Sequence, residues 1–137
     1  MYYKKLMIYT DGGARGNPGP AAIGVIIKAE DGRVLKKIAL SIGRATNNQA
    51  EYKAVIAGLE KAKEFGAKEL IVFLDSELVV KQFNRQYKVK DPDLALLFLK
   101  IYNLTVGYKK VSFKYLARQD NRGADELVNQ ALDKEGK

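Results

Sequence analysis

Four isolated carboxylates stand where the sequence pattern changes from one structural element to the next. Asp11 and Asp75 each follow a short apolar run, and Asp11 precedes a turn rich in Gly, Asn and Pro. Glu51 and Asp125 lie in the first turns of two segments with helical periodicity. Carboxylate oxygens are the ligands that Mg²⁺ prefers. Two such ions ~3.5–4 Å apart can flank a scissile phosphate, so these acids predict a metal-dependent site that cleaves phosphodiesters.

Two neighbouring stretches could bring the backbone close to a ligand. Gly12 and Gly13 follow Asp11 and carry no Cβ, so a ligand can approach their backbone closely. Asn47 and Asn48 stand at the start of the first expected helix, where exposed amides lie beside free N–H groups and can seat a phosphate.

The composition limits the chemistry that is available. The chain has 137 residues and contains neither histidine nor cysteine, so imidazole bases, disulfides and thiolate zinc sites are excluded. The net charge is +8 and the sequence pI is about 9.6, which favours an anionic partner such as nucleic acid. A basic surface that only aids solubility explains the charge equally well. The length predicts one domain over residues 1–137.

The sequence favours a cytoplasmic location. Lys4 and Lys5 interrupt the N-terminal segment before any long apolar run, which does not fit a signal peptide. No stretch approaches the ~20 apolar residues of a membrane span.

The hydrophobic pattern predicts an α/β fold with the element order βββαβααβα and a mixed five-stranded sheet flanked by helices. The expected strands cover about residues 4–10, 22–29, 34–42, 70–74 and 111–116; the expected helices cover about 46–65, 76–83, a segment opening after Asp91-Pro92, and 121–134. The first three strands form an antiparallel meander, and the first, fourth and fifth run parallel. Asp11 then ends the first strand and Asp75 the fourth, so both emerge at the carboxyl edge of the sheet.

The combined motifs resemble type 1 ribonuclease H. The chain contains Thr-Asp-Gly…Gly-Asn-Pro-Gly-Pro, then Thr-Asn-Asn-x-x-Glu, then Asp-Ser, then Asn-x-x-x-Asp, in unbroken order over nearly its whole length. The resemblance implies the ribonuclease H-like fold and hydrolysis of the RNA strand of RNA–DNA hybrids, with water attacking the phosphodiester to leave 5′-phosphate and 3′-hydroxyl ends. It also implies two Mg²⁺ ions, with Mn²⁺ as a substitute.

The same resemblance assigns roles to single residues. Asp11 would bridge both metal ions, Asp125 would help to hold the ion that activates the water, and Glu51 and Asp75 would help to hold the ion at the leaving oxygen.

Neutral residues receive roles in binding the hybrid. Asn17 and Asn47 would reach its minor groove, and Thr46 and Asn48 would clasp a phosphate of the DNA strand. A protein that reads groove shape, 2′-hydroxyls and backbone is suited to such a duplex.

The sequence departs from the family pattern at three places. The loop before Asp125 lacks the histidine that many members carry, and Arg118 is its natural substitute because a guanidinium binds phosphate bidentately. Glu77 follows Asp75-Ser76, where some members have a groove-contacting glutamine.

The third departure concerns a basic surface. The segment 84–93 is short, so the basic protrusion of some members is missing. Arg85, Lys88 and Lys90 would replace part of its charge.

Three alternatives remain open on the sequence. The chain could be a hybrid-binding module without turnover, or a nuclease of the same fold that acts on double-stranded RNA or on junctions. Each acid alone could be a turn former, a surface charge or a helix cap. All four acids in these contexts favour a catalytic site, in a protein that we expect to be a monomer.

Overall fold

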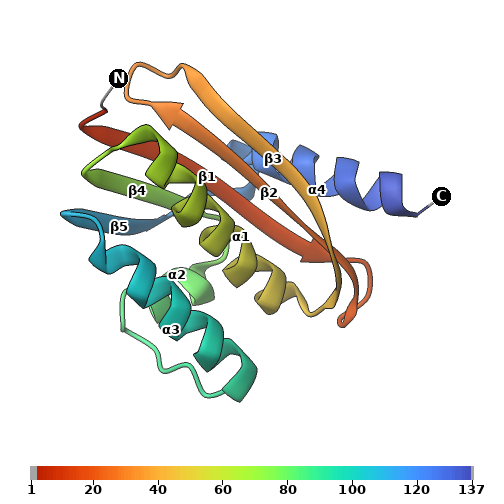
Figure 1. The fold of residues 1–137 in the computed structure, drawn as a ribbon. Coiled ribbons are helices and arrows are strands. Elements are labelled where there is room, and N and C mark those ends of the chain that lie inside the picture. The colour runs from red at the N-terminus through yellow and green to blue at the C-terminus, as the bar shows by residue number, and fades with distance from the viewer. Residues whose placement is uncertain (1–2, 137) are drawn as a thin grey trace.

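One mixed sheet organises the chain (Figure 1). The computed structural model describes residues 3–136. Its strands are β1 (Lys5–Ala14), β2 (Gly19–Ala29), β3 (Val34–Ala45), β4 (Glu69–Leu74) and β5 (Lys110–Tyr115). Their spatial order is β3-β2-β1-β4-β5, with β1, β4 and β5 parallel and β2 and β3 antiparallel additions. The predicted element order and mixed sheet are confirmed.

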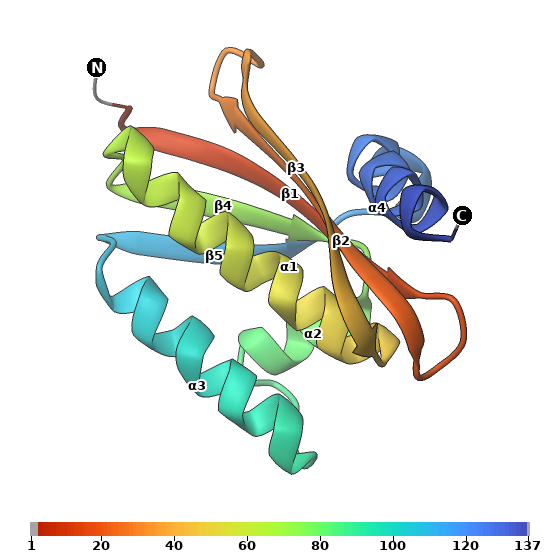
Figure 2. The same cartoon turned by 45° about the vertical axis from the view of Figure 1, so that its right-hand side comes forward.

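Helices cover both faces of this sheet. They are α1 (Asn47–Ala62), α2 (Glu77–Phe83), α3 (Pro92–Val106) and α4 (Arg122–Glu135), with 3₁₀ turns at Lys63–Phe65 and Arg118–Asp120. The sheet separates α4 from α1, α2 and α3, as the turned view shows (Figure 2). Among the described helices, none is long and apolar enough to cross a membrane.

The position of Asp11 within β1 differs from the prediction. We expected Asp11 to end the first strand, but β1 continues to Ala14. The reason is its second neighbour: parallel pairing with β4 stops at Tyr9, whereas antiparallel pairing with β2 continues from Asp11 opposite Gly24 to Ala14 opposite Ala21. Asp11 therefore still lies just beyond the parallel part of the sheet.

The main core lies between the sheet and α1. Fully buried Ile8 and Val25 of the sheet belong to one apolar cluster with Tyr52 and Leu59 of α1. Small residues set the distance between layers on the opposite face. A Cβ on Gly24 of β2 would lie 2.3 Å from the backbone oxygen of Ala124, so α4 packs directly on the strand backbone there.

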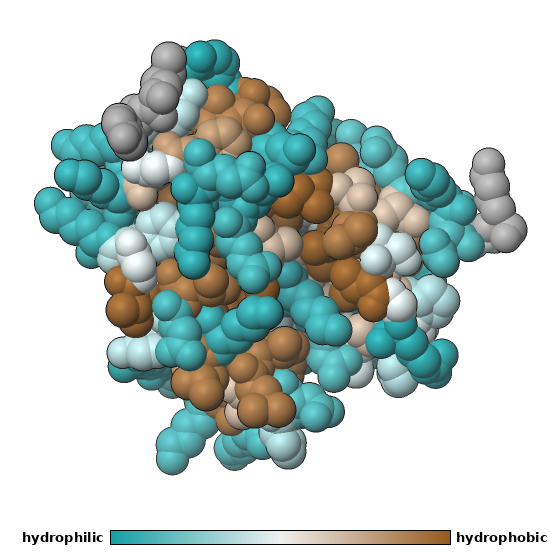
Figure 3. All heavy atoms as spheres, viewed as in Figure 1, coloured by the Kyte–Doolittle hydropathy of each residue, from teal (hydrophilic) through white to brown (hydrophobic). Residues whose placement is uncertain are grey.

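The outer face of α3 leaves apolar side chains in solvent. Leu96 and Val106 are 71% and 69% exposed, and Leu99 is also exposed. Hydrophobic side chains accordingly gather over α3 in the space-filling view (Figure 3). This helix is held from its inner side, where Leu94 and Ile101 are buried.

The contact between β2 and α4 generates a stability prediction. In Gly24→Ala the added methyl group has no room, so α4 must shift, and we expect a loss of about 1–3 kcal/mol in the free energy of unfolding. Urea denaturation measures this loss. Gly107→Ala is the matched control, because its nearest neighbour would lie 3.8 Å away. Equal urea midpoints for the two variants would contradict the tight β2–α4 contact.

Candidate active site

Three acids from distant parts of the sequence converge at the carboxyl edge of the parallel strands. Asp11 comes from β1, Glu51 from the second turn of α1, and Asp75 from the residue after β4. Each offers one carboxylate oxygen, and these oxygens lie within 4.8 Å of one another. Asp11 and Glu51 are only 7% and 6% exposed. The structure thus brings together three of the four acids that the sequence singled out.

Gly12 allows α1 to approach β1 closely enough for this convergence. A Cβ on Gly12 would lie 2.2 Å from the carbonyl carbon of Ala50 and 2.5 Å from the nitrogen of Glu51. Its backbone N–H donates to Asp11 Oδ1 at 3.0 Å and to Glu51 Oε1 at 2.9 Å. One backbone donor therefore orients two carboxylates of the site.

The start of α1 is fixed by local hydrogen bonds. The Thr46 hydroxyl accepts from the Gln49 N–H, and the Gln49 side-chain oxygen accepts from the Thr46 N–H, which forms a capping box. Asn17 Oδ1 accepts from the Asn47 N–H at 3.0 Å, and Asn47 Oδ1 accepts from the Ala14 N–H at 2.9 Å. These bonds tie the β1–β2 turn to the helix that carries Glu51.

Asn121 positions the third acid. Its side-chain amide donates to the carbonyl of Thr10 and to Asp75 Oδ2, both at 3.0 Å, and the residue is 2% exposed. In the sequence Asn121 stands out only as a member of the last motif, and the motif assigns it no role. An asparagine before a helix normally indicates a cap, but this side chain makes no capping hydrogen bond.

Asp125 and Arg118 line a hollow in the surface together with the three clustered acids. Arg118 Nη2 lies 3.6 Å from Asp125 Oδ1, and the Arg118 side chain is 79% exposed. Asp125, in the first turn of α4, is not one of the three acids with clustered oxygens. This carboxylate hollow has a volume of about 370 Å³, and its lining also contains Gly12, Gly13, Asn47, Asn48 and Ser76.

Burial and mutual repulsion favour the protonated forms of the two innermost acids. Burial, with the charges of Asp75 and Asp125, raises the pKa of Asp11 from 3.8 to about 7. Burial and the charge of Asp11 raise the pKa of Glu51 well above its usual value. The interaction between the two carboxyl groups lowers the pKa of Asp11 and raises that of Glu51.

The donor set fits a hard cation. Glu51 Oε2 is buried and has no hydrogen-bond partner among the described residues. An unpartnered buried carboxylate oxygen is costly unless a cation or a proton satisfies it. The three clustered oxygens have the chemistry that Mg²⁺ or Mn²⁺ requires.

Comparison with known proteins identifies the family of this chain. Residues 9–131 match the family described as reverse transcriptase-like. The crystal structure of RNase H1 from Halobacterium salinarum has 42% sequence identity and a TM-score of 0.92, over 95% of this chain and 98% of that one. This chain belongs to the type 1 ribonuclease H family.

Two further relatives are similar to this chain over most of its length. LC11-RNase H1, solved in complex with an RNA/DNA hybrid, is 47% identical with a TM-score of 0.92, over 96% of this chain and 99% of that one. The bifunctional protein Rv2228c of Mycobacterium tuberculosis is 44% identical over 94% of this chain. The chain spans only 36% of that relative, and 63% of the ribonuclease HI of Halobacterium salinarum.

The basic residues singled out by the sequence lie apart from the clustered acids. Arg85, Lys88 and Lys90 are exposed in the connection between α2 and α3, and none lines the carboxylate hollow. Glu77 is exposed at the start of α2, with an oxygen 3.9 Å from Lys81 Nζ. Arg118 is therefore the predicted cation that the fold places beside the acids.

The raised pKa of Asp11 predicts how the stability of the metal-free protein depends on pH. Between about pH 4 and pH 7 the folded state holds a proton on Asp11 that the unfolded state has released, so stability falls as the pH rises through this window. In Asp11→Asn this loss disappears, and above pH 7 we expect the variant to be more stable than the wild type by about 1–3 kcal/mol. Urea denaturation in EDTA at pH 5 and pH 8 measures the difference.

Two comparisons make this prediction specific. Glu126→Gln removes an exposed acid of α4 and should leave the pH dependence unchanged. Adding Mg²⁺ at pH 8 should stabilise the wild type more than Asp11→Asn, because the cation binds the ionised carboxylates. A constant difference between Asp11→Asn and the wild type from pH 5 to pH 8 would show that Asp11 is not perturbed.

Proposed function

We propose that this protein is an endonuclease that hydrolyses the RNA strand of RNA–DNA hybrids by a two-metal-ion mechanism. The observation that carries the proposal is the cluster of Asp11, Glu51 and Asp75 around an unpartnered buried carboxylate oxygen. The relative LC11-RNase H1, solved with an RNA/DNA hybrid, supports the choice of substrate. We expect products with 5′-phosphate and 3′-hydroxyl ends.

The four acids would hold the metal ions. Asp11, Glu51 and Asp75 offer clustered oxygens, and Asp125 offers another in the same hollow. When bound, two Mg²⁺ or Mn²⁺ ions neutralise charge on the scissile phosphate and lower the pKa of a bound water. Gly12 and Asn121 keep the carboxylates in place through the hydrogen bonds from their amide groups.

The surface around the acids would bind the hybrid. Gly12, Gly13, Asn47 and Asn48 line the hollow, and the backbone at the two glycines is accessible to a phosphodiester strand. The further binding residues that we propose are Asn17 and Thr46 beside the hollow, and Arg85, Lys88 and Lys90 between α2 and α3. Contacts of the last three with phosphates would make affinity fall with salt.

We propose that residues 1–137 act as one ribonuclease H domain. The sheet, its helices and the connection after β4 supply all the acids named here. Double-stranded RNA is the second candidate substrate, since recognition through 2′-hydroxyls and groove shape serves both duplexes.

A cleavage assay tests the proposal. Purified protein is incubated with RNA–DNA, RNA–RNA and DNA–DNA duplexes of one sequence, with Mg²⁺, with Mn²⁺ or with EDTA. We expect cleavage of the hybrid that requires the metal, and a loss of about 10²-fold or more in Asp11→Asn and in Asp75→Asn, because an amide is a poor ligand for these ions. Glu126→Gln should keep wild-type turnover.

Other outcomes assign a different function. Hybrid binding without cleavage in either metal would identify a binding module. Preferential cleavage of RNA–RNA would identify a double-stranded RNA nuclease of the same fold. Near-wild-type turnover in Asp11→Asn would refute the carboxylate site itself.

Arg118 gives a separate prediction about turnover. It is the cation beside Asp125, and a guanidinium stays charged over the working pH range. Arg118→Ala should lower kcat by about 10-fold or more and change hybrid affinity less, and Arg118→Lys should restore only part of the loss. Single-turnover rates at saturating hybrid and Mg²⁺, with separate affinity measurements in EDTA, distinguish the two effects.

A remote arginine provides the control. Arg33 lies in the β2–β3 turn and has its own partner, Asp31, so Arg33→Ala should change neither quantity appreciably. Equal kcat in Arg118→Ala and the wild type would show that Arg118 does not replace the absent histidine.

A further inference from the structure

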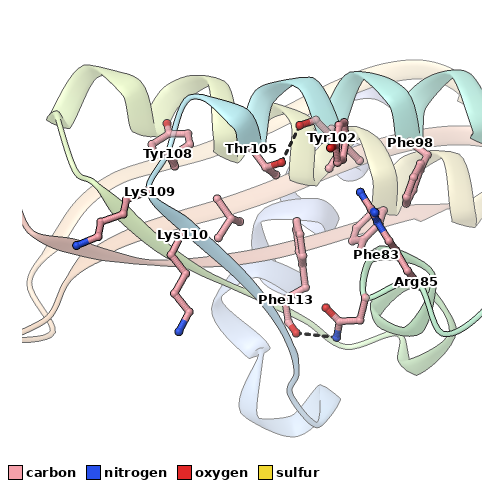
Figure 4. Close-up of a pocket in the computed structure, with 12 residues that line it drawn as sticks. Phe83, Arg85, Phe98, Tyr102, Thr105, Tyr108, Lys109, Lys110 and Phe113 are labelled. Carbon is pink, nitrogen blue, oxygen red and sulfur yellow. Dashed lines mark hydrogen bonds between the residues drawn. The ribbon is translucent and has the colours of Figure 1, made fainter.

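A second hollow lies between the end of α2, the inner side of α3 and strand β5 (Figure 4). Its volume is about 250 Å³. Aromatic rings dominate its lining: Phe83, Phe98, Tyr102, Tyr108 and Phe113. We call it the aromatic pocket. It is smaller than the ~300–1,000 Å³ of most small-molecule sites, so it suits a single planar ring.

All charged side chains that line the aromatic pocket are basic. Arg85, Lys109 and Lys110 contribute to it, and none of its described lining residues is acidic. The Arg85 guanidinium lies 4.9 Å from the centre of the Tyr102 ring, a cation–π contact at the rim. Arg85 is also the one non-glycine residue with positive φ (61°) among those described. Because such a conformation is strained, the surrounding structure must hold Arg85 in place.

The positive charge continues along the amino edge of the parallel strands. Lys109 is shared with an adjoining hollow that also includes Lys4 and Lys68, with Glu69 as its acid. Lys109 and Lys68 are held together by a backbone hydrogen bond of 2.8 Å. The catalytic acids lie at the carboxyl edge, and the six residues of β4 separate the two edges by ~20 Å. No residue of the aromatic pocket lines the carboxylate hollow.

We propose that the aromatic pocket binds a nucleotide of single-stranded nucleic acid. One base enters among the rings, and the flanking phosphates lie along Lys109 and Lys110. Aromatic faces beside a basic track are the combination with which proteins bind single strands without sequence preference. This function goes beyond the proposed cleavage of hybrids, because apart from Arg85 it uses residues to which that function assigns no role, and none of them lines the carboxylate hollow. It would hold a single-stranded extension of a hybrid while the duplex occupies the catalytic hollow.

A hydrogen bond already made at the free edge of β5 argues against a peptide as the occupant of the aromatic pocket. An extended peptide would add to this open edge through free backbone groups. The Phe113 carbonyl is already occupied, since it accepts a hydrogen bond from the Asn84 side-chain amide at 3.2 Å. A base needs only the ring faces and a nearby cation, both of which the aromatic pocket supplies.

Fluorescence anisotropy with labelled dT12 in EDTA tests the proposal. We expect Tyr102→Ala to weaken binding about tenfold through loss of stacking, and Tyr102→Phe to bind as the wild type does. The double variant Lys109→Gln/Lys110→Gln should weaken binding and reduce the slope of log affinity against log salt by about 1.4. The matched control is Lys36→Gln/Lys37→Gln, which removes two exposed lysines of β3, and its slope should change by clearly less.

Cleavage of a blunt hybrid, measured in parallel, separates this proposal from the first. Tyr102→Ala should cleave it within twofold of the wild-type rate, and Asp11→Asn should bind dT12 within twofold of the wild type. Three results would overturn the proposal: no binding of dT12, equal weakening by both lysine pairs, or equal affinity in Tyr102→Ala and Tyr102→Phe. Tight binding of a peptide rich in Asp and Phe at this pocket, with weak binding of dT12, would assign the pocket to a protein partner.

Discussion

The crowding of anions at the junction of β1, α1 and β4 is the constraint on which the rest of the structure depends. Asp11 and Glu51 are nearly buried, and Asp75 is within reach of both. Such a group is unfavourable without a proton or a cation, as the raised pKa of Asp11 indicates. The fold holds the carboxylates in place through hydrogen bonds from the N–H of Gly12 and the side-chain amide of Asn121. The repulsion among these acids therefore lowers the folding stability, while their oxygens are held in fixed positions in which they could bind a cation.

Close packing on both faces of the β1–β2 pair supports this site. Gly12 lets the first turns of α1 contact the backbone of β1, and Gly24 lets α4 contact the backbone of β2. Because Asp11 pairs with Gly24 across the two strands, both contacts occur at the same level of the sheet. The helix that carries Glu51 and the helix that carries Asp125 are thus positioned from opposite faces. A shift of either helix would change the spacing of the acids.

The net charge of +8 is a sum that includes two surfaces, one acidic and one basic. The carboxyl edge of the parallel strands concentrates acids, with Arg118 as a cation beside them. The amino edge and the adjoining aromatic pocket concentrate lysines, among them Lys68, Lys109 and Lys110. In the absence of bound metal, the acidic edge repels a polyanion. The basic groups elsewhere would then supply the attraction, which is a reason for one small protein to carry both.

The sequence by itself determined the order of elements and the chemistry of the acids. Those depend on local properties: hydrophobic period, turn residues and the type of side chain at a strand or helix end. Tertiary structure decided the rest, because pairing and packing join residues far apart in the chain. Pairing with β2 extends β1 beyond Asp11. Folding also brings the Asn121 side chain into hydrogen-bond contact with Asp75, which lies 46 residues away in the sequence. The aromatic pocket likewise needed α2, α3 and β5 to meet, since its rings show no common period along the sequence.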